Sequence, residues 1–384
     1  MTEPRMDLDV PVLDIDTVLD DPAIRIIVCT GAGGVGKTTT AAALALRAAE
    51  RGRRVCVLTI DPARRLAQAM GLTHLDNSPK AVIGVEGPGS LDAMMLDMKR
   101  TFDEVVEAHA DPEKAASILA NPFYQALSSS FAGTQEYMAM EKLGQLRAQA
   151  DADGRWDLIV VDTPPSRSAL DFLDAPARLG SFLDGRLIRI LTAPARGAGR
   201  GLGQLMAAGF SVFSNTLGRL LGAQVLADVG TFVAAIDTTF GGFRERAEAT
   251  YALLQDAGTA FVVVATPERD ALREAAYFVE RLRADAMPLA GLVLNRVQAL
   301  QLVDVSEQQA IAAADRLTDG DDVSGFTAAL LRLHAQRQQV ASRQRQLAER
   351  FTKAHPGVAA TTVPALAEDV HDLNGLRAVG DLLA

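Results

Sequence analysis

A glycine-rich run that ends in a lysine and a threonine contains the residues best suited to chemistry. The segment from Gly31 to Thr38 is Gly-Ala-Gly-Gly-Val-Gly-Lys-Thr, which matches the pattern G-x-x-x-x-G-K-[ST]. Glycines let consecutive backbone N–H groups approach an anion closely, and the helix predicted after the loop directs its positive dipole end at the same anion. The lysine supplies a cation to the outer phosphates, and the threonine hydroxyl is a hard ligand for Mg²⁺. The run therefore predicts a site for a nucleoside triphosphate with magnesium.

Two carboxylates that close apolar strands complete this pattern. Asp162 is expected to hold Mg²⁺ together with Thr38, unless it only caps a helix. Asp61 is expected to act in catalysis together with Lys37, unless it is a turn carboxylate before Pro62. Open α/β sheets bind their ligands at the carboxyl ends of parallel strands, where both aspartates are predicted to lie. The predicted phosphate-binding residues are Gly33, Gly34, Val35, Gly36, Lys37, Thr38 and Thr39.

Strand and helix patterns alternate around these residues. Apolar runs of strand length predict strands at residues 24–29, 54–60, 156–161, 261–265, 289–294 and 357–363. Helical patterns with stop signals predict helices at residues 37–50, 268–284 and 373–383. This alternation predicts an α/β fold with a doubly wound, mostly parallel sheet of the P-loop NTPase type. Residues 101–150 and 179–255 lack a strand pattern and predict an inserted α-helical subdomain.

The same patterns divide the chain into four parts. Residues 1–21 are predicted to form an acidic N-terminal arm that is flexible or packs at an edge. Residues 22–100, 151–178, 256–300 and 355–384 form the predicted P-loop nucleotide-binding domain. Residues 101–150 and 179–255 form the predicted helical subdomain, and residues 301–354 form a further helical segment.

The composition argues against several classes of function. The chain has 38 Lys and Arg against 48 Asp and Glu, and its net charge of −10 disfavours broad nucleic-acid binding. Its two cysteines, Cys29 and Cys56, lie in predicted strands, so neither a disulfide framework nor a zinc site is expected. The N-terminus lacks a signal-peptide pattern, and residues 201–218 are too short and polar for a comfortable membrane span. The sequence predicts a cytoplasmic protein without stable membrane insertion, and leaves a peripheral position at the membrane open.

Three motifs resemble those of a known group of enzymes. The loop through Thr39, the segment Asp61-Pro62-Ala63 and the segment Asp162-Thr163-Pro164-Pro165 are similar to the deviant-Walker ATPases. Among these, the chain is most similar to the ArsA-type arsenite-pump ATPases and to their relatives that target tail-anchored membrane proteins. The resemblance implies a dimeric switch that binds ATP or ADP with Mg²⁺, hydrolyses ATP and carries helical insertions.

The resemblance also implies roles for individual residues. Asp61 would position the attacking water, and the segment that begins at Asp162 would couple loss of the γ-phosphate to movement. Asn295 matches an asparagine that recognises adenine, although a turn residue after a strand is the alternative. Pro364 lies where a proline-bearing loop packs on the base.

Three departures separate the chain from that group. The family's loop has a signature lysine that reaches the nucleotide of the other subunit, and this chain has Ala32 there. The family's switch has a glycine where this chain has Arg167. The arsenite-binding cysteines are missing, so a subunit of an arsenite pump is not expected. With alanine at this position, a homodimer of this chain alone is predicted to hydrolyse ATP weakly. The alternative is a heterodimer with a paralogue that carries the lysine.

The partner of such a switch stays open. Residues 202–221 carry apolar side chains at helical spacing, which fits a groove for a hydrophobic or membrane-associated protein client. An ordinary helical core or a subunit contact explains the same pattern. Two other functions remain as alternatives: a weakly or non-catalytic nucleotide-binding subunit of a heteromeric ATPase complex, and a MinD- or ParA-like positioning ATPase. No nucleic-acid partner is expected.

Overall fold

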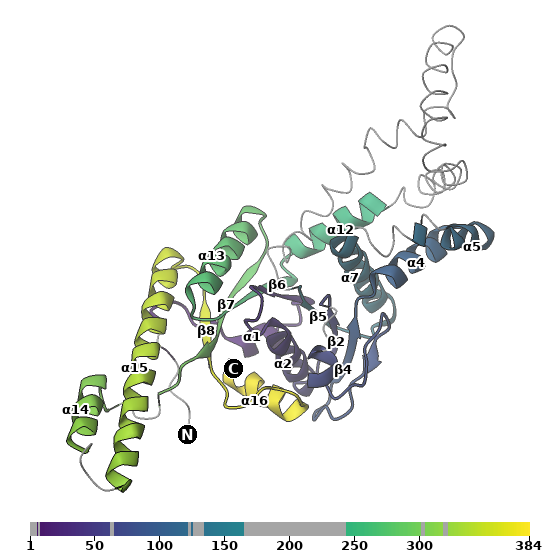
Figure 1. Cartoon of the computed structure of the whole chain (residues 1–384). Coiled ribbons are helices and arrows are strands. Elements are labelled where there is room, and N and C mark those ends of the chain that lie inside the picture. The colour runs from purple at the N-terminus through teal and green to yellow at the C-terminus, as the bar shows by residue number, and fades with distance from the viewer. Residues whose placement is uncertain are drawn as a thin grey trace, which may run out of the picture. The chain divides into compact units, whose positions relative to one another are not determined.

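A computed structural model describes residue 6 and residues 8–61, 65–121, 124–125, 134–164, 243–300, 304–317 and 322–384 (Figure 1). The chain divides into two compact units: Met1–Met95, Ala152–Leu170 and Leu253–Ala384 form the first, and Leu96–Asp151 and Asp171–Ala252 form the second. Several predictions lie outside the described residues, namely those on Pro62 and Ala63, on Arg167, on the helices expected between 179 and 242, and on the apolar pattern of residues 202–221. No helix within the described part is long and apolar enough to cross a membrane.

The first unit is built on one eight-stranded sheet with the strand order β3-β4-β2-β5-β1-β6-β7-β8. Neighbouring strands are parallel except for β3 and β4, which are antiparallel. The strands are β1 (Ile26–Gly31), β2 (Arg54–Thr59), β3 (Lys80–Ala81), β4 (Ser90–Met95), β5 (Leu158–Asp162), β6 (Thr259–Ala265), β7 (Leu289–Val297) and β8 (Ala360–Pro364). The predicted α/β fold with a mostly parallel sheet is confirmed.

Strand β1 lies at the centre of the sheet and fixes the position of the glycine-rich loop. All residues of β1 are buried, as are those of its neighbour β6. The register pairs Cys29 with Asp162 of β5 and Gly31 with Val264 of β6. A Cβ atom on Gly31 would come within 2.1 Å of the Val264 carbonyl oxygen, so only glycine fits at the end of β1. The glycine-rich loop and Asp162 therefore lie together at the carboxyl ends of these parallel strands.

Helices cover the sheet, and one of them directly follows the glycine-rich loop. The helices of this unit are α1 (Ile15–Asp20), α2 (Lys37–Glu50), α3 (Arg65–Ala69), α13 (Arg269–Ala284), α14 (Glu307–Leu317), α15 (Asp322–Ala354) and α16 (Leu373–Leu383). Most of α2 is buried, because its run of Ala and Leu packs on the sheet and against α16. The first residue of α2 is Lys37, so burial of this helix holds the lysine at the end of β1.

The edge of the sheet at β3 and β4 was not expected from the sequence. Strand β4 is polar in part, because it contains Asp92. The Asp92 carboxylate accepts hydrogen bonds from Trp156 Nε1 at 2.9 Å and from Arg155 Nη2 at 2.8 Å. These long-range donors make a carboxylate tolerable in a strand, and a pattern of apolar residues cannot reveal them.

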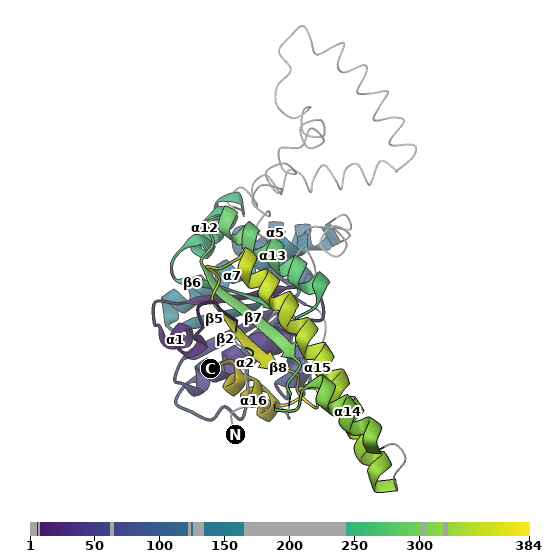
Figure 2. The same ribbon diagram turned by 90° about the vertical axis from the view of Figure 1, so that its left-hand side faces the viewer.

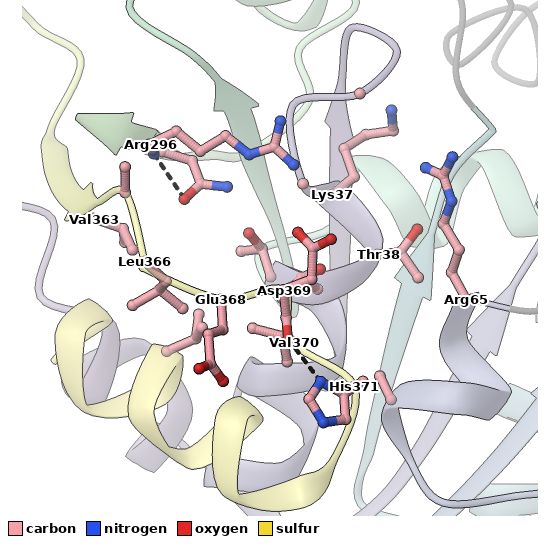
Figure 3. Close-up of a pocket in the computed structure, with 18 of the residues that line it drawn as sticks. Lys37, Thr38, Arg65, Arg296, Val363, Leu366, Glu368, Asp369, Val370 and His371 are labelled. Atoms are coloured by element: carbon pink, nitrogen blue, oxygen red, sulfur yellow. Dashed lines mark hydrogen bonds between the residues drawn. The ribbon is translucent and has the colours of Figure 1, made fainter. Parts of the chain in front are cut away.

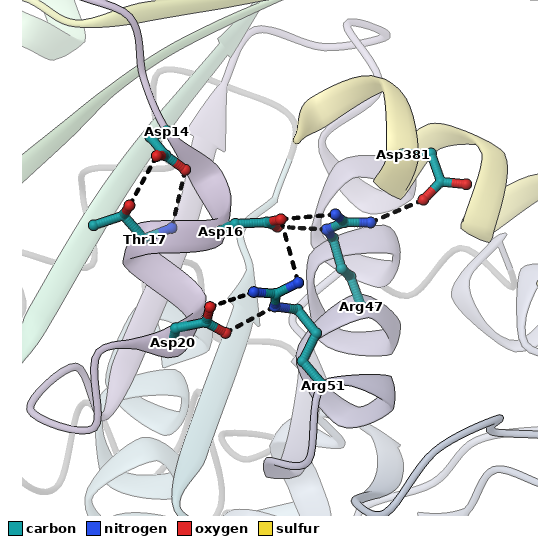
Figure 4. A network of polar contacts seen from close by, with 7 residues as sticks. All are labelled: Asp14, Asp16, Thr17, Asp20, Arg47, Arg51 and Asp381. Carbon is teal, nitrogen blue, oxygen red and sulfur yellow. Dashed lines mark hydrogen bonds and ion pairs between the residues drawn. The ribbon is translucent and has the colours of Figure 1, made fainter.

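The acidic residues of the N-terminal arm pair with arginines on α2 (Figure 4). The arm contains helix α1, and its Asp16 Oδ1 lies 2.6 Å from Arg47 Nε. Arg47 also reaches Asp381 of α16 at 2.9 Å, and Arg51 pairs with Asp20. These arginines hold the pKa of Asp16 below its usual value. Arginines of α2 thus join it both to the arm and to α16.

The C-terminal part of the first unit contains a long helical hairpin. Helices α14 and α15 pack against each other, and Figure 2 shows α15 running beside the strands. The buried residues of α15 include Ala335, Ala341 and Phe351. Phe326 and Leu330, near the other end of α15, are exposed.

The second unit is helical in the residues that the structure describes. Its helices are α4 (Met98–His109), α5 (Pro112–Ala120), most of α7 (Thr134–Asp153) and most of α12 (Phe243–Gln255). Two partly buried ion pairs join them: Lys142 Nζ lies 2.9 Å from Glu104 Oε2, and Arg246 Nε lies 3.0 Å from Glu141 Oε2.

Candidate functional site

A cavity of about 680 Å³ opens at the carboxyl ends of the strands, beside the glycine-rich loop (Figure 3). Its volume is in the range of small-molecule and cofactor sites. The predicted site residues that line it are Gly34, Gly36, Lys37, Thr38, Thr39, Asp61, Asn295 and Pro364. The loop also borders a second cavity of about 280 Å³, which is lined by Gly33, Gly34 and Val35 among others. The fold thus gathers residues from β1, β2, β7 and β8 around one loop.

Lys37 is buried at the start of α2 and turns its ammonium group back onto the loop. Its Nζ donates a hydrogen bond of 2.7 Å to the carbonyl oxygen of Ala32, and the residue is 5% exposed. Burial lowers the pKa of Lys37, whereas the nearby carboxylates of Asp162 and Asp61 favour its charged form. An ammonium group has three donors, so this one bond leaves Lys37 donors for an anion in the cavity.

Asp162 lies fully buried at the end of β5 and lines neither cavity. Its Oδ2 accepts a hydrogen bond of 2.8 Å from Thr59 Oγ1, while its Oδ1 is buried without a hydrogen-bond partner among the described residues. Burial raises the pKa of Asp162 to about 6, against the effects of the Thr38 and Thr59 hydroxyls and of Lys37. A buried carboxylate oxygen without a partner, close to a threonine hydroxyl, fits the hard oxygen ligands that Mg²⁺ prefers.

Magnesium bound with a nucleotide would share its ligands between protein and phosphate oxygens. In the part of the chain that the structure describes, no group of three or more His, Cys, Asp or Glu side chains could hold a metal ion. Sites that bind Mg²⁺ with a nucleotide commonly use one or two protein oxygens plus phosphates and water. Thr38 and Asp162 meet that requirement.

Because the pKa of Asp162 is raised, its ionised form is expected to lower the free energy of unfolding of the metal-free protein. The ordinary pKa is 3.8 and the folded value is about 6, so the folded protein binds the proton more tightly than the unfolded chain. The free energy of unfolding should therefore fall as pH rises from about 4 to about 6 and stay low above this window. Replacing Asp162 with Asn should raise the free energy of unfolding at pH 7.5 by up to about 3 kcal/mol.

Urea unfolding in the presence of a chelator, at several pH values, measures this effect for the wild type and the Asn variant. Asparagine keeps an acceptor for Thr59, so the comparison isolates the charge. The same variant should lose stabilisation by Mg²⁺ and ATP. An Asn variant that is less stable than the wild type at pH 7.5, with an unchanged pH dependence, would contradict the electrostatic cost.

Asp61 is joined to Asp162 by one threonine. The Asp61 backbone N–H donates to Thr59 Oγ1 at 3.2 Å, and the same hydroxyl donates to Asp162. Asp61 also lines the larger cavity. The Thr59 hydroxyl therefore links the positions of the two predicted carboxylates.

Asn295 connects the end of β7 to the loop. Its Nδ2 donates to the Val35 carbonyl oxygen at 2.8 Å, and its Oδ1 accepts from the Arg296 backbone N–H at 2.9 Å. Gly36 has a φ of 95°, and a Cβ atom there would lie 2.3 Å from Asn295 Nδ2. The glycine before Lys37 thus makes room for the asparagine, which keeps one N–H and one lone pair for a base.

Five charged or titratable residues of the larger cavity were not singled out by the sequence analysis: Arg65, Arg296, Glu368, Asp369 and His371. Figure 3 places Arg65 and Arg296 on opposite sides of Lys37 and Thr38. Their signal in the sequence is weak, because each is a polar residue in a loop or at a helix start. Only the return of the chain after β8 brings Glu368, Asp369 and His371 to this cavity.

The two cysteines do not form an exposed thiol site. Cys29 and Cys56 are both free and buried, in β1 and β2. Burial raises the pKa of the Cys29 thiol far above its usual range. Both are therefore poor ligands for a soft metalloid.

Comparisons with known proteins agree with the α/β fold. ATPase GET3 of Malassezia globosa is 31% identical over 169 residues, which cover 44% of this chain and 47% of that protein. ATPase GET3 of Podospora anserina is 27% identical over 293 residues, 74% of this chain and 76% of that protein. An arsenical pump-driving ATPase of Escherichia coli is 31% identical over 157 residues, 40% of this chain and 26% of that protein. The chain thus spans less than half of the first relative and about a quarter of the last. The anion-transporting ATPase family matches residues 24–313, and the chain belongs to this family.

Proposed function

We propose that the chain binds ATP with Mg²⁺ in the larger cavity and hydrolyses it. One observation carries the proposal: Lys37, Thr38 and Asp61 line the cavity, and the buried Asp162 carboxylate has an oxygen without a hydrogen-bond partner among the described residues. A phosphate chain would meet the lysine and the loop amides, and a magnesium ion would meet the unpartnered oxygen. Membership of an ATPase family supports the same nucleotide.

Each residue has a role in this proposal. The loop amides and Lys37 hold the phosphate oxygens, and the dipole of α2 adds to their positive potential. Thr38 and Asp162 would hold a magnesium ion, which would neutralise charge that develops on the transferred phosphoryl group. Asp61 orients the attacking water by accepting a hydrogen bond from it, and the Thr59 hydroxyl keeps Asp61 in place relative to Asp162.

The base would lie on the β7 and β8 side of the cavity. Asn295 and Pro364 line the cavity from these strands, and Leu366 and Val370, which Figure 3 labels, add apolar side chains to its lining. A flat purine ring fits between apolar side chains, and the remaining donor and acceptor of Asn295 suit the edge of adenine.

The proposed enzyme works as a switch in a dimer. The segment that begins at Asp162 leaves the site through Thr163, whose Oγ1 donates to the Cys29 carbonyl oxygen at 2.8 Å. Further along the chain, residue 171 begins the part of the sequence that belongs to the second, helical unit. We propose that ATP and ADP hold this segment differently, and that the helical unit passes the difference to a protein or membrane-associated partner.

Two measurements test the central claim. Isothermal calorimetry with ATP, ADP and Mg²⁺ measures binding, and release of inorganic phosphate measures hydrolysis. Micromolar binding of ATP and magnesium-dependent turnover are expected. A purified, folded protein that binds no adenine nucleotide would overturn the proposal.

A second candidate is a nucleotide-binding subunit with little turnover of its own. Ala32 favours it, because the loop has no cation at that position beside the smaller cavity. Replacing Ala32 with Lys should raise turnover by the homodimer at least about tenfold, since a charge-assisted bond to the phosphoryl group is worth about 1.5–3 kcal/mol. Equal phosphate release by the variant and the wild type would show that the alanine is not what limits hydrolysis.

The structure gives less support to a positioning ATPase of the MinD type, which would need a free amphipathic helix at its C-terminus. Helix α16 is amphipathic, but Leu376, Val379 and Leu383 are buried, and the helix packs on α2. Its apolar face is therefore already used inside the first unit.

A further inference from the structure

Arg296 has a backbone conformation that costs energy and needs an explanation. Its φ is 59°, and Ala286 is the only other non-glycine residue with a positive φ among the described residues. This left-handed region costs an L-residue about 1–2 kcal/mol, and such strain gathers at functional sites. The conformation is held by Asn295, whose Oδ1 accepts the Arg296 N–H while its Nδ2 holds the Val35 carbonyl. The strained residue is thus fastened to the phosphate loop.

The strained backbone directs the arginine side chain toward the loop. In Figure 3 the side chain extends from the end of β7 to the neighbourhood of Lys37. Arg296 lines both the larger cavity and the smaller one, and loop residues line both cavities as well. An exposed arginine would ordinarily extend into solvent, since nothing on its own strand holds it.

Among the residues that the structure describes, none pairs with the guanidinium group of Arg296, although three carboxylates line the smaller cavity with it. Within the described residues it makes no hydrogen bond or ion pair, whereas Arg47, Arg53 and Arg377 each pair with a carboxylate. Glu268, Asp270 and Glu274 line the smaller cavity together with Arg296, yet none of them is paired with it. Its position therefore suits an anion that is not part of the chain.

We propose that Arg296 binds the phosphate chain of the nucleotide held by its own loop, as a second cation beside Lys37. The proposal rests on the proposed function, because it requires a nucleotide in the larger cavity. A guanidinium group presents planar paired donors that match phosphate oxygens. Ala32 supplies no charge to the smaller cavity, and Arg296 is the only cationic side chain among the described residues that line it. Asn295 acts as a positioning residue that aims Arg296.

Two variants test the proposal without changing the backbone strain. Arg296→Gln removes the charge and keeps a similar length, and Arg296→Lys keeps a charge without the planar fork. Neither is glycine, so both retain the cost of the left-handed conformation. Arg316→Gln, on α14 and lining neither cavity, is the matched control.

The measurement is the dissociation constant for ATP, ADP, AMP and adenosine, by competition with a fluorescent ADP derivative. Arg296→Gln should weaken ATP binding about 10- to 100-fold, ADP less and adenosine not at all. Arg296→Lys should recover part of the ATP affinity, and Arg316→Gln should bind all four ligands as the wild type does. The loss should also shrink at high salt, because it is electrostatic.

Three results would overturn the proposal, and they differ from failure of the proposed function. Wild-type affinity of Arg296→Gln for ATP would remove the contact. An equal loss for ATP and adenosine would assign Arg296 to the shape of the cavity and not to phosphate. If Arg296→Lys did not restore the ratio of ATP to adenosine affinity even in part, charge would be excluded as the cause of the loss. A wild-type protein that binds none of the four ligands would remove the proposed function and this inference together.

Discussion

Replacing Lys37 with Met is expected to weaken ATP binding roughly thirtyfold to several-thousandfold. The lysine is 5% exposed and sits at the start of α2, where its ammonium group faces the loop. Removing one partner of a buried charged contact costs about 2–5 kcal/mol, and each 1.4 kcal/mol is a factor of about ten in affinity. Methionine keeps most of the volume of the side chain, so the fold should survive. Calorimetric titration with ATP and Mg²⁺ measures the loss.

A matched control separates this effect from a general change of charge. Lys353 lies on α15, its side chain is 80% exposed, and it lines neither cavity. Lys353→Met should bind ATP as the wild type does and unfold at the same temperature. If Lys37→Met bound ATP with undiminished affinity, the cavity beside the loop would not be the nucleotide site.

The loop and its two carboxylates could be predicted because local rules determine them. Gly36 has a left-handed backbone conformation and immediately precedes α2, whose first residue is Lys37. Asp61 and Asp162 follow buried apolar strands, and parallel strands bring their carboxyl ends to one edge. Nothing in the sequence singles out Thr59 among the residues of its strand. The link that its hydroxyl makes between the two aspartates is therefore known only from the structure.

The rest of the site depends on contacts between distant parts of the chain. Asp92 is tolerated in β4 only because Trp156 and Arg155 donate to it, and the sequence therefore concealed this strand. Arg296 is an ordinary polar residue after a strand until its φ of 59° is known. Residues 366–371 reach the cavity because the chain after β8 turns back toward α2 before α16. Apolar periodicity carries no information on such long-range contacts.

Replacing Asp61 with Asn is expected to lower the rate of ATP hydrolysis at least about a hundredfold while ATP still binds. A carboxylate that orients and polarises water contributes about 10²- to 10⁴-fold to the rate of such reactions. Asparagine has the same shape, and its backbone N–H can still donate to Thr59 Oγ1. Loss of a negative charge near the phosphates should leave ATP affinity unchanged or raise it slightly. Phosphate release at saturating ATP, with a parallel titration, gives both quantities.

Asp369 provides the matched control, because it lines the same cavity but lies on the segment that follows β8. Asp369→Asn should leave turnover within about twofold of the wild type, since in this proposal its carboxylate does not orient the attacking water. Equal losses in the two variants would trace the effect to the net charge of the cavity. Unchanged turnover in Asp61→Asn would leave Asp61 as a turn residue at the end of β2, and the water would have to be oriented by another group beside Lys37 and Thr38. Only a loss confined to Asp61→Asn, with ATP affinity preserved, separates orientation of the water from binding of the phosphates.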